Sequence, residues 1–182
     1  MMPKDSSLIS GSRRIVRTVA AGLISVAFAH PAFAACYTPK EAAAEQAIRI
    51  HSELMVVGLT CAAQFRDPAL FARYAAFTNK HSNELRAHES AIIGYFAKTA
   101  EGNPKRRFDH WRTSIANSVS TRAALSSAGI YCGDKRELVA ALDAASRFDG
   151  KRVNAILEYA PEASVISRPM CAQDAVALST TE

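Results

Sequence analysis

Three histidines fall on the mostly apolar stripes of two predicted helices. They are His51, in a helix predicted over 40–65, and His81 and His88, in the next predicted helix. Counting about 1.5 Å per residue along two antiparallel helices places His51 at a level between His81 and His88. Glu84 is one turn from each histidine of the second helix, so it could act as a fourth ligand or orient one of them.

A transition metal or a haem group held by these histidines is therefore one hypothesis. However, His81 and His88 are about 10 Å apart on a straight helix, which is too far for one ion. The sequence has no Cys-x-x-Cys-His, which excludes covalent haem attachment, and Met55 could either bind haem with a histidine or simply pack in the core. We favour the simpler interpretation, in which the histidines hydrogen-bond to neighbouring helices and no cofactor is bound.

Basic and aromatic residues alternate in the segment 105–112, whose cations are Lys105, Arg106, Arg107 and Arg112. Cations at the start of a helix oppose its dipole, so we expect something other than helix stability to favour them. An envelope protein or an anionic surface, such as lipid head groups or a polysaccharide, would suit this patch. The alternative is a solvated helix face around two inward-facing aromatic residues.

The composition excludes several classes of protein. The 182 residues are 49% hydrophobic and 21% charged, which suits one globular domain and is too apolar for disorder. No run of 18 apolar residues occurs, so we expect no transmembrane helix in the mature chain. The formal net charge of +5 falls to +2 without residues 1–34, and nucleic acid is therefore not an expected partner. The sequence lacks Gly-rich phosphate loops and the common hydrolase motifs, so an enzyme is not indicated.

The first 34 residues have the three regions of a secretory signal peptide. Arginines precede an apolar run over 19–29, and the small-residue triplet Ala32-Phe33-Ala34 follows. We predict cleavage after Ala34 and a periplasmic or secreted location. The alternative is a lipoprotein acylated on Cys36, although Phe33 stands where a branched aliphatic residue is expected.

Apolar residues at alternating spacings of three and four predict an all-α fold, an up-down bundle of four to five helices. The bundle domain is expected over 35–162, followed by a C-terminal tail over 163–182. After the helix over 40–65, the predicted helices cover 68–101, with a weak point near 78–80, then 104–128, 134–148 and a short segment ending before Pro161. Gly129 is the expected C-cap of the third helix, and Asp134 with Glu137 has the form of a capping box.

Four cysteines in an exported chain predict two disulfides. If 40–65 is one helix, Cys36 and Cys61 lie at its opposite ends, roughly 35 Å apart, far beyond the reach of a disulfide. Two further antiparallel helices bring Cys132 to the level of Cys61. We therefore predict the pairs Cys61–Cys132 and Cys36–Cys171, and the absence of Cys-x-x-Cys argues against a zinc site.

The stretch HSELMVVGLTC over 51–61, together with Ile130-Tyr131-Cys132, resembles a family of small, uncharacterised, exported helical proteins of bacteria. The resemblance implies an all-helical, periplasmic, cysteine-bridged fold and no particular activity or cofactor. The expected function is therefore that of a binding or envelope-associated accessory protein. The alternative function is a metal- or haem-binding bundle that uses the three histidines.

Overall fold

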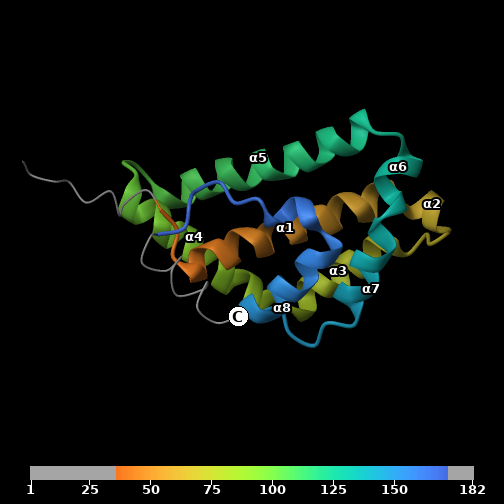
Figure 1. The fold of residues 1–182 in the computed structure, drawn as a ribbon, viewed down its shortest axis with the longest axis horizontal. Coiled ribbons are helices and arrows are strands. Elements are labelled where there is room, and N and C mark those ends of the chain that lie inside the picture. Colours follow the sequence, from red (N-terminus) through yellow and green to blue (C-terminus); the bar gives the residue numbers. More distant parts are fainter. Residues whose placement is uncertain (1–35, 172–182) are drawn as a thin grey trace, which may run out of the picture. The chain divides into compact units, whose positions relative to one another are not determined.

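The computed structural model describes residues 36–171, which are mainly helical and contain no strand beyond a single bridge between Tyr37 and Met170 (Figure 1). The all-α prediction is confirmed for this part of the chain. The helices are α1 (Pro39–Thr60), α2 (Ala62–Phe65), α3 (Leu70–Lys80), α4 (Ser82–Thr99), α5 (Pro104–Leu125), α6 (Ala128–Gly133), α7 (Lys135–Asp143) and α8 (Gly150–Ile156). Two 3-10 turns follow, η2 (Leu157–Tyr159) and η3 (Pro161–Ser164).

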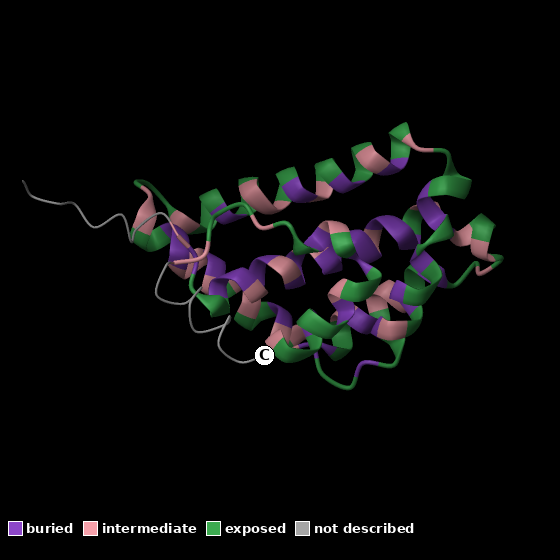
Figure 2. Ribbon diagram, viewed as in Figure 1, coloured by how far each residue is buried: buried purple, intermediate pink, exposed green. Residues whose placement is uncertain are grey.

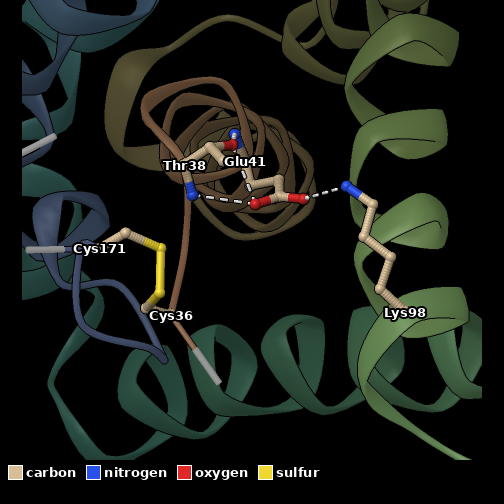
Figure 3. Close-up of a disulfide and its surroundings, with 5 residues drawn as sticks. All are labelled: Cys36, Thr38, Glu41, Lys98 and Cys171. Atoms are coloured by element: carbon tan, nitrogen blue, oxygen red, sulfur yellow. Dashed lines mark hydrogen bonds and ion pairs between the residues drawn. A yellow bond between two sulfur atoms is a disulfide. The ribbon is translucent and has the colours of Figure 1, made fainter. Parts of the chain in front are cut away.

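Helix α1 begins at a capping box. The Thr38 hydroxyl accepts the N–H of Glu41 at 3.3 Å, and Glu41 Oε2 accepts the N–H of Thr38 at 2.9 Å (Figure 3). Pro39 occupies the first helical position, where its missing N–H costs nothing. Glu41 Oε1 also lies 3.5 Å from Lys98 Nζ, which links the start of α1 to the last turn of α4.

Helix α1 is the central helix, and α3, α4, α5 and α8 all pack against it. Fourteen of its 22 residues are buried, so it carries more than the single apolar stripe that the sequence indicated. Small residues allow this close packing. A side chain at Gly58 would bring a Cβ atom within 3.3 Å of Phe71 Cα in α3. Helix α5, by contrast, shows an exposed outer face along much of its length (Figure 2).

Two of the predicted long helices are divided. The helix predicted over 40–65 ends at Thr60, and α2 continues it only after Cys61. The helix predicted over 68–101 is divided at His81, next to the predicted weak point, where the backbone leaves the helical region at φ −104° and ψ 21°. Neither break contains glycine or proline, so tertiary contacts and not local propensity account for them. The prediction of four to five helices was therefore too low.

The predicted roles of two residues in the C-terminal half are wrong. Gly129 does not cap the third helix, because α5 has already ended and Gly129 lies inside α6, whose N-cap is Ser127. Asp134 precedes α7, but its side chain makes no capping bond and the box with Glu137 does not form. Ser127 starts a new helix before Gly129, because its hydroxyl accepts the N–H of Ile130 at 3.3 Å and so caps α6.

Helix α7 is shorter than predicted. It ends at Asp143, so Ala145 and Phe148 lie in the connection 144–149, although both are fully buried as expected. Asp149 does not merely interrupt a helix. Its carboxylate accepts the N–H of Arg152 at 3.0 Å and so caps α8.

Both predicted disulfides are confirmed. Cys61 at the end of α1 bonds to Cys132 in α6, and Cys36 bonds to Cys171 with a Cα separation of 5.0 Å (Figure 3). The Cys36 sulfur is thus bonded to another sulfur, which is incompatible with its acylation in a lipoprotein. The predicted signal peptide, residues 1–34, lies outside the described residues.

The predicted tail lies along α1 as far as Cys171. The Ser167 N–H and hydroxyl donate to the buried Glu45 carboxylate at 2.9 and 2.7 Å. The N–H of Tyr37 donates to the Pro169 carbonyl at 2.8 Å, and the N–H of Cys171 donates to the Tyr37 carbonyl at 3.0 Å. None of the helices within 36–171 is both long and apolar enough to cross a bilayer.

Candidate functional site

His51 binds a threonine on α3 and does not approach the other two histidines. Its Nε2 lies 3.0 Å from Thr78 Oγ1. The single proton of the Thr78 hydroxyl is donated to the Tyr74 carbonyl at 2.9 Å, so the Thr78 oxygen accepts the N–H of His51. Burial, reinforced by the positive charge of Arg112, lowers the pKa of His51 to about 4. The predicted level of His51, between His81 and His88, is therefore wrong.

His88 donates from Nε2 to the carbonyl oxygen of Phe148, 2.8 Å away. The N–H of Glu84 itself is the main cause that lowers the pKa of the Glu84 carboxyl, and His81 and then the N–H of Phe148 lower it further. Lys80 Nζ donates to the Ala145 carbonyl at 2.6 Å. Lys80, Glu84 and His88 are spaced four residues apart, and all three hold the backbone of the connection 144–149. We call these three residues the Phe148 clamp.

His81 is the exception among the three histidines, because neither ring nitrogen has a hydrogen-bond partner among the described residues. The side chain is 1% exposed, and its ring lies 4.6 Å from the Phe77 ring and 6.1 Å from the Phe148 ring. Its Nδ1 is 3.7 Å from Glu84 Oε1, beyond hydrogen-bond range. Buried polar groups are normally paired, so packing alone does not account for a histidine here.

The residues considered for a metal or haem do not converge. The three histidines bind a hydroxyl, a carbonyl and no partner, and within residues 36–171 no group of three or more histidine, cysteine or acidic side chains is placed to hold a metal ion. Met55 is half-buried and packs against the hydrophobic core. The three histidines therefore do not form one shared ligand set within residues 36–171.

A cavity of about 220 Å³ adjoins the Phe148 clamp. It lies between α1, α4 and the start of α8, and its lining combines four small residues with four ionisable ones: Ala43, Ala87, Ala91 and Gly150, and Lys40, Glu84, His88 and Asp149. Two clamp residues, Glu84 and His88, form part of its wall. The clamp therefore positions both the connection 144–149 and one side of this cavity.

A second polar cluster, which the sequence did not reveal, surrounds Glu53. This carboxylate is 1% exposed, accepts the Tyr131 hydroxyl at 2.9 Å, and pairs with Arg122 and Lys135. Glu162 pairs with the same two cations, so two carboxylates face two cations. Desolvation and the nearby Glu53 charge raise the pKa of Tyr131. Because the charges are balanced and mutually paired, we interpret this network as structural.

The sequence signal for this network was a glutamate directly before the apolar run 54–59. Its partners could not be found from spacing, because Arg122, Tyr131 and Lys135 belong to three other helices.

The basic segment at the start of α5 is divided between paired and unpaired cations. Lys105, Arg106 and Arg107 are exposed, and no carboxylate of residues 36–171 forms an ion pair with them. Arg107 instead donates to the backbone carbonyl of Glu101 at 3.2 Å. Arg112 is half-buried and paired with Glu89, so it does not belong to the unpaired group.

Comparison with known protein families, with characterised proteins and with solved structures gives no match. The fold itself defines an all-α domain closed by two disulfides. A function must therefore be inferred from the residues described above.

Proposed function

We propose that this protein is an exported, disulfide-bonded accessory protein of the cell envelope, and that it binds anionic phospholipid through the first turn of α5. Pairing of all four cysteines supports an oxidising compartment, since disulfides persist there and are rare in the cytosol. The signal-peptide pattern of residues 1–34 supports export in the same way.

The observation that carries the proposal is the row of exposed, unpaired cations Lys105, Arg106 and Arg107. They occupy the N-terminal turn of a 22-residue helix, where a cation opposes the helix dipole and an acidic residue would be stabilising. Asn103 caps this turn by accepting the N–H groups of Lys105 and Arg106 at 3.0 and 3.2 Å. The side chains of Lys105 and Arg106 are therefore not needed to cap the helix, and Arg107 makes one backbone contact, to the Glu101 carbonyl at 3.2 Å.

The energy available from such a row is sufficient for reversible binding. A lysine or arginine near an anionic membrane surface contributes about 1 kcal/mol, so three contribute about 3 kcal/mol. That free energy corresponds to roughly a hundredfold change in affinity. Because the contacts are solvent-exposed, salt should weaken them.

Sedimentation with phospholipid vesicles tests the proposal. We expect the protein to bind vesicles of phosphatidylcholine that contain phosphatidylglycerol, and not vesicles of phosphatidylcholine alone. The triple variant Lys105→Ala/Arg106→Ala/Arg107→Ala should lose roughly a hundredfold in affinity. Absence of binding to the anionic vesicles would refute the proposal.

A matched control is available in another exposed basic group. Arg147, Lys151 and Arg152 line a separate hollow beside α8, and replacing all three with alanine changes the net charge by the same amount. We expect this control variant to bind vesicles nearly as well as the unmodified protein. An equal loss in both variants would show that net charge, and not the α5 turn, determines binding.

A further inference from the structure

We propose that His81 makes the Phe148 clamp pH-sensitive, so that protonation of this buried ring loosens the connection 144–149. The proposal rests on three geometric facts. Within residues 36–171 the ring has no hydrogen-bond partner, it packs against the Phe148 ring, and its charged neighbour Glu84 also interacts with the Phe148 N–H.

The site as built suits a neutral His81. A neutral ring tolerates the aromatic surroundings of Phe77 and Phe148, but an imidazolium ring carries a second N–H that would need an acceptor. No acceptor lies within hydrogen-bond range of either nitrogen among the described residues. A protonated ring would lie within ion-pair range of the Glu84 carboxylate, 3.7 Å from Nδ1, but neither of its N–H groups would have a hydrogen-bond acceptor within residues 36–171. A buried charged donor without a hydrogen bond is costly, so protonation favours a local rearrangement.

Two rearrangements are available, and both act on Phe148. In the first, Glu84 turns toward the imidazolium ring, whose Nδ1 is only 3.7 Å away, and its contact with the Phe148 N–H weakens. In the second, the charged ring leaves its buried position, and Phe148 loses one of the aromatic rings packed around it. Either response removes a contact that holds the connection 144–149.

The neighbouring ionisable groups do not change charge in the same pH range. Backbone N–H groups are the main cause that lowers the pKa of both the Glu84 and Asp149 carboxyls, with His81 adding to the effect on Glu84, so both carboxyls stay ionised near neutral pH. On α1, His51 has a pKa lowered to about 4 and stays neutral. The cations nearest the connection are Lys80 of α3, which donates to the Ala145 carbonyl, and Arg147 of the connection itself, which pairs with Asp149.

The remaining groups near the connection keep their present contacts. Asp143, at the end of α7, pairs with Arg73 of α3, and Lys151 of α8 is exposed. The Nε2 of His88 donates to the Phe148 carbonyl whether the ring is neutral or charged. Protonation of His88 therefore preserves its contact, whereas protonation of His81 does not.

Hydrogen–deuterium exchange of the whole protein tests the proposal. Exchange would be measured at about pH 8 and about pH 5, the two sides of histidine titration, and corrected for the intrinsic pH dependence of exchange. We expect peptides that cover 144–150 to exchange about tenfold faster at the lower pH relative to peptides of α1. In the variant His81→Phe, which keeps an aromatic ring, this difference should disappear.

The variant His88→Gln is the matched control, because its amide can still donate to the Phe148 carbonyl but does not titrate. We expect it to keep the pH response. The proposal is wrong if the unmodified protein shows no response, if His81→Phe retains it, or if His88→Gln abolishes it. Should His81→Phe fail to fold, NMR titration of the His81 ring in the unmodified protein provides the test, because its midpoint must coincide with that of the exchange change.

Discussion

Tyr131 donates its hydroxyl to Glu53 across 2.9 Å and joins α6 to the central helix. Both side chains are buried, and the ammonium group of Lys135 lies 5.8 Å from the Tyr131 ring as well as 3.3 Å from Glu53 Oε1. One glutamate therefore coordinates an aromatic hydroxyl and two cations at the end of the bundle that also contains the Cys61–Cys132 disulfide.

Removal of Glu53 should destabilise the protein strongly. The change Glu53→Ala leaves Lys135, itself 7% exposed, with half of its compensating charge, and we expect the free energy of unfolding to fall by about 3–5 kcal/mol. Tyr131→Phe removes one hydrogen bond to a charged group and should cost about 1.5–3 kcal/mol. Urea unfolding measures both. The control Glu137→Ala, at an exposed position on α7, should change the free energy of unfolding by less than about 0.5 kcal/mol. If Glu53→Ala loses no more stability than this control, the ion-pair network around Glu53 does not stabilise the fold.

Each disulfide should contribute to stability through the unfolded chain. Cys61 and Cys132 are 71 residues apart, and Cys36 and Cys171 are 135 apart, so each bond closes a long loop. We expect the double variant Cys61→Ala/Cys132→Ala to lose about 2–5 kcal/mol in denaturant unfolding without reductant. Reducing agent should then destabilise this variant by less than it destabilises the unmodified protein. If reductant has the same effect on both, the Cys61–Cys132 bond is not contributing.

His81 offers a substitution that should stabilise the protein. At about pH 8, His81→Phe replaces two unpaired buried nitrogens with carbon while keeping an aromatic ring between Phe77 and Phe148. We expect a gain of about 1–3 kcal/mol, the cost of leaving a buried polar group unsatisfied. Thermal unfolding measures it, with His51→Phe as the contrast, because that change breaks the bond to Thr78 and should destabilise. A loss of stability in His81→Phe would mean that the nitrogens are satisfied in solution.

His51 should make stability depend on pH in a defined window. Its pKa is about 4 in the folded protein and ordinarily 6.5, so above pH 6.5 the ring is neutral in both states and contributes fully. As the pH falls from 6.5 toward 4, the unfolded chain binds the proton first, and up to about 3 kcal/mol of stability is lost. Urea unfolding across this range should show a shallower pH dependence in His51→Gln. Parallel curves for the two proteins would contradict the lowered pKa.

The cysteine pairing was predictable from sequence because one helix length excludes a bond between Cys36 and Cys61. Short connections between antiparallel helices then bring Cys132 to the level of Cys61 and leave Cys171 to pair with Cys36. The structure confirms both pairs.

The helix start at Pro104 was also predictable, since proline at the first position is a local signal. The same signal at Pro68 misplaced the start of the next helix, because α3 begins at Leu70.

The divisions at Cys61 and His81 were not predictable in the same way, because they depend on contacts with other helices. The heights of the histidines depend on these divisions, so His51 faces Thr78 and not the later histidines. The repeat of polar residues at Lys80, Glu84 and His88 was visible in the sequence. The sequence does not show that the connection 144–149 lies against this repeat, where its backbone carbonyls accept from Lys80 and His88.

The two disulfides are nested, with Cys61–Cys132 lying inside the loop that Cys36–Cys171 closes. A protease that cuts any one peptide bond between Cys36 and Cys171 therefore cannot divide the domain into separate molecules. Between Cys61 and Cys132 the fragments remain joined by two bonds. A nicked domain would thus keep its pieces at high effective concentration and could re-close after local damage.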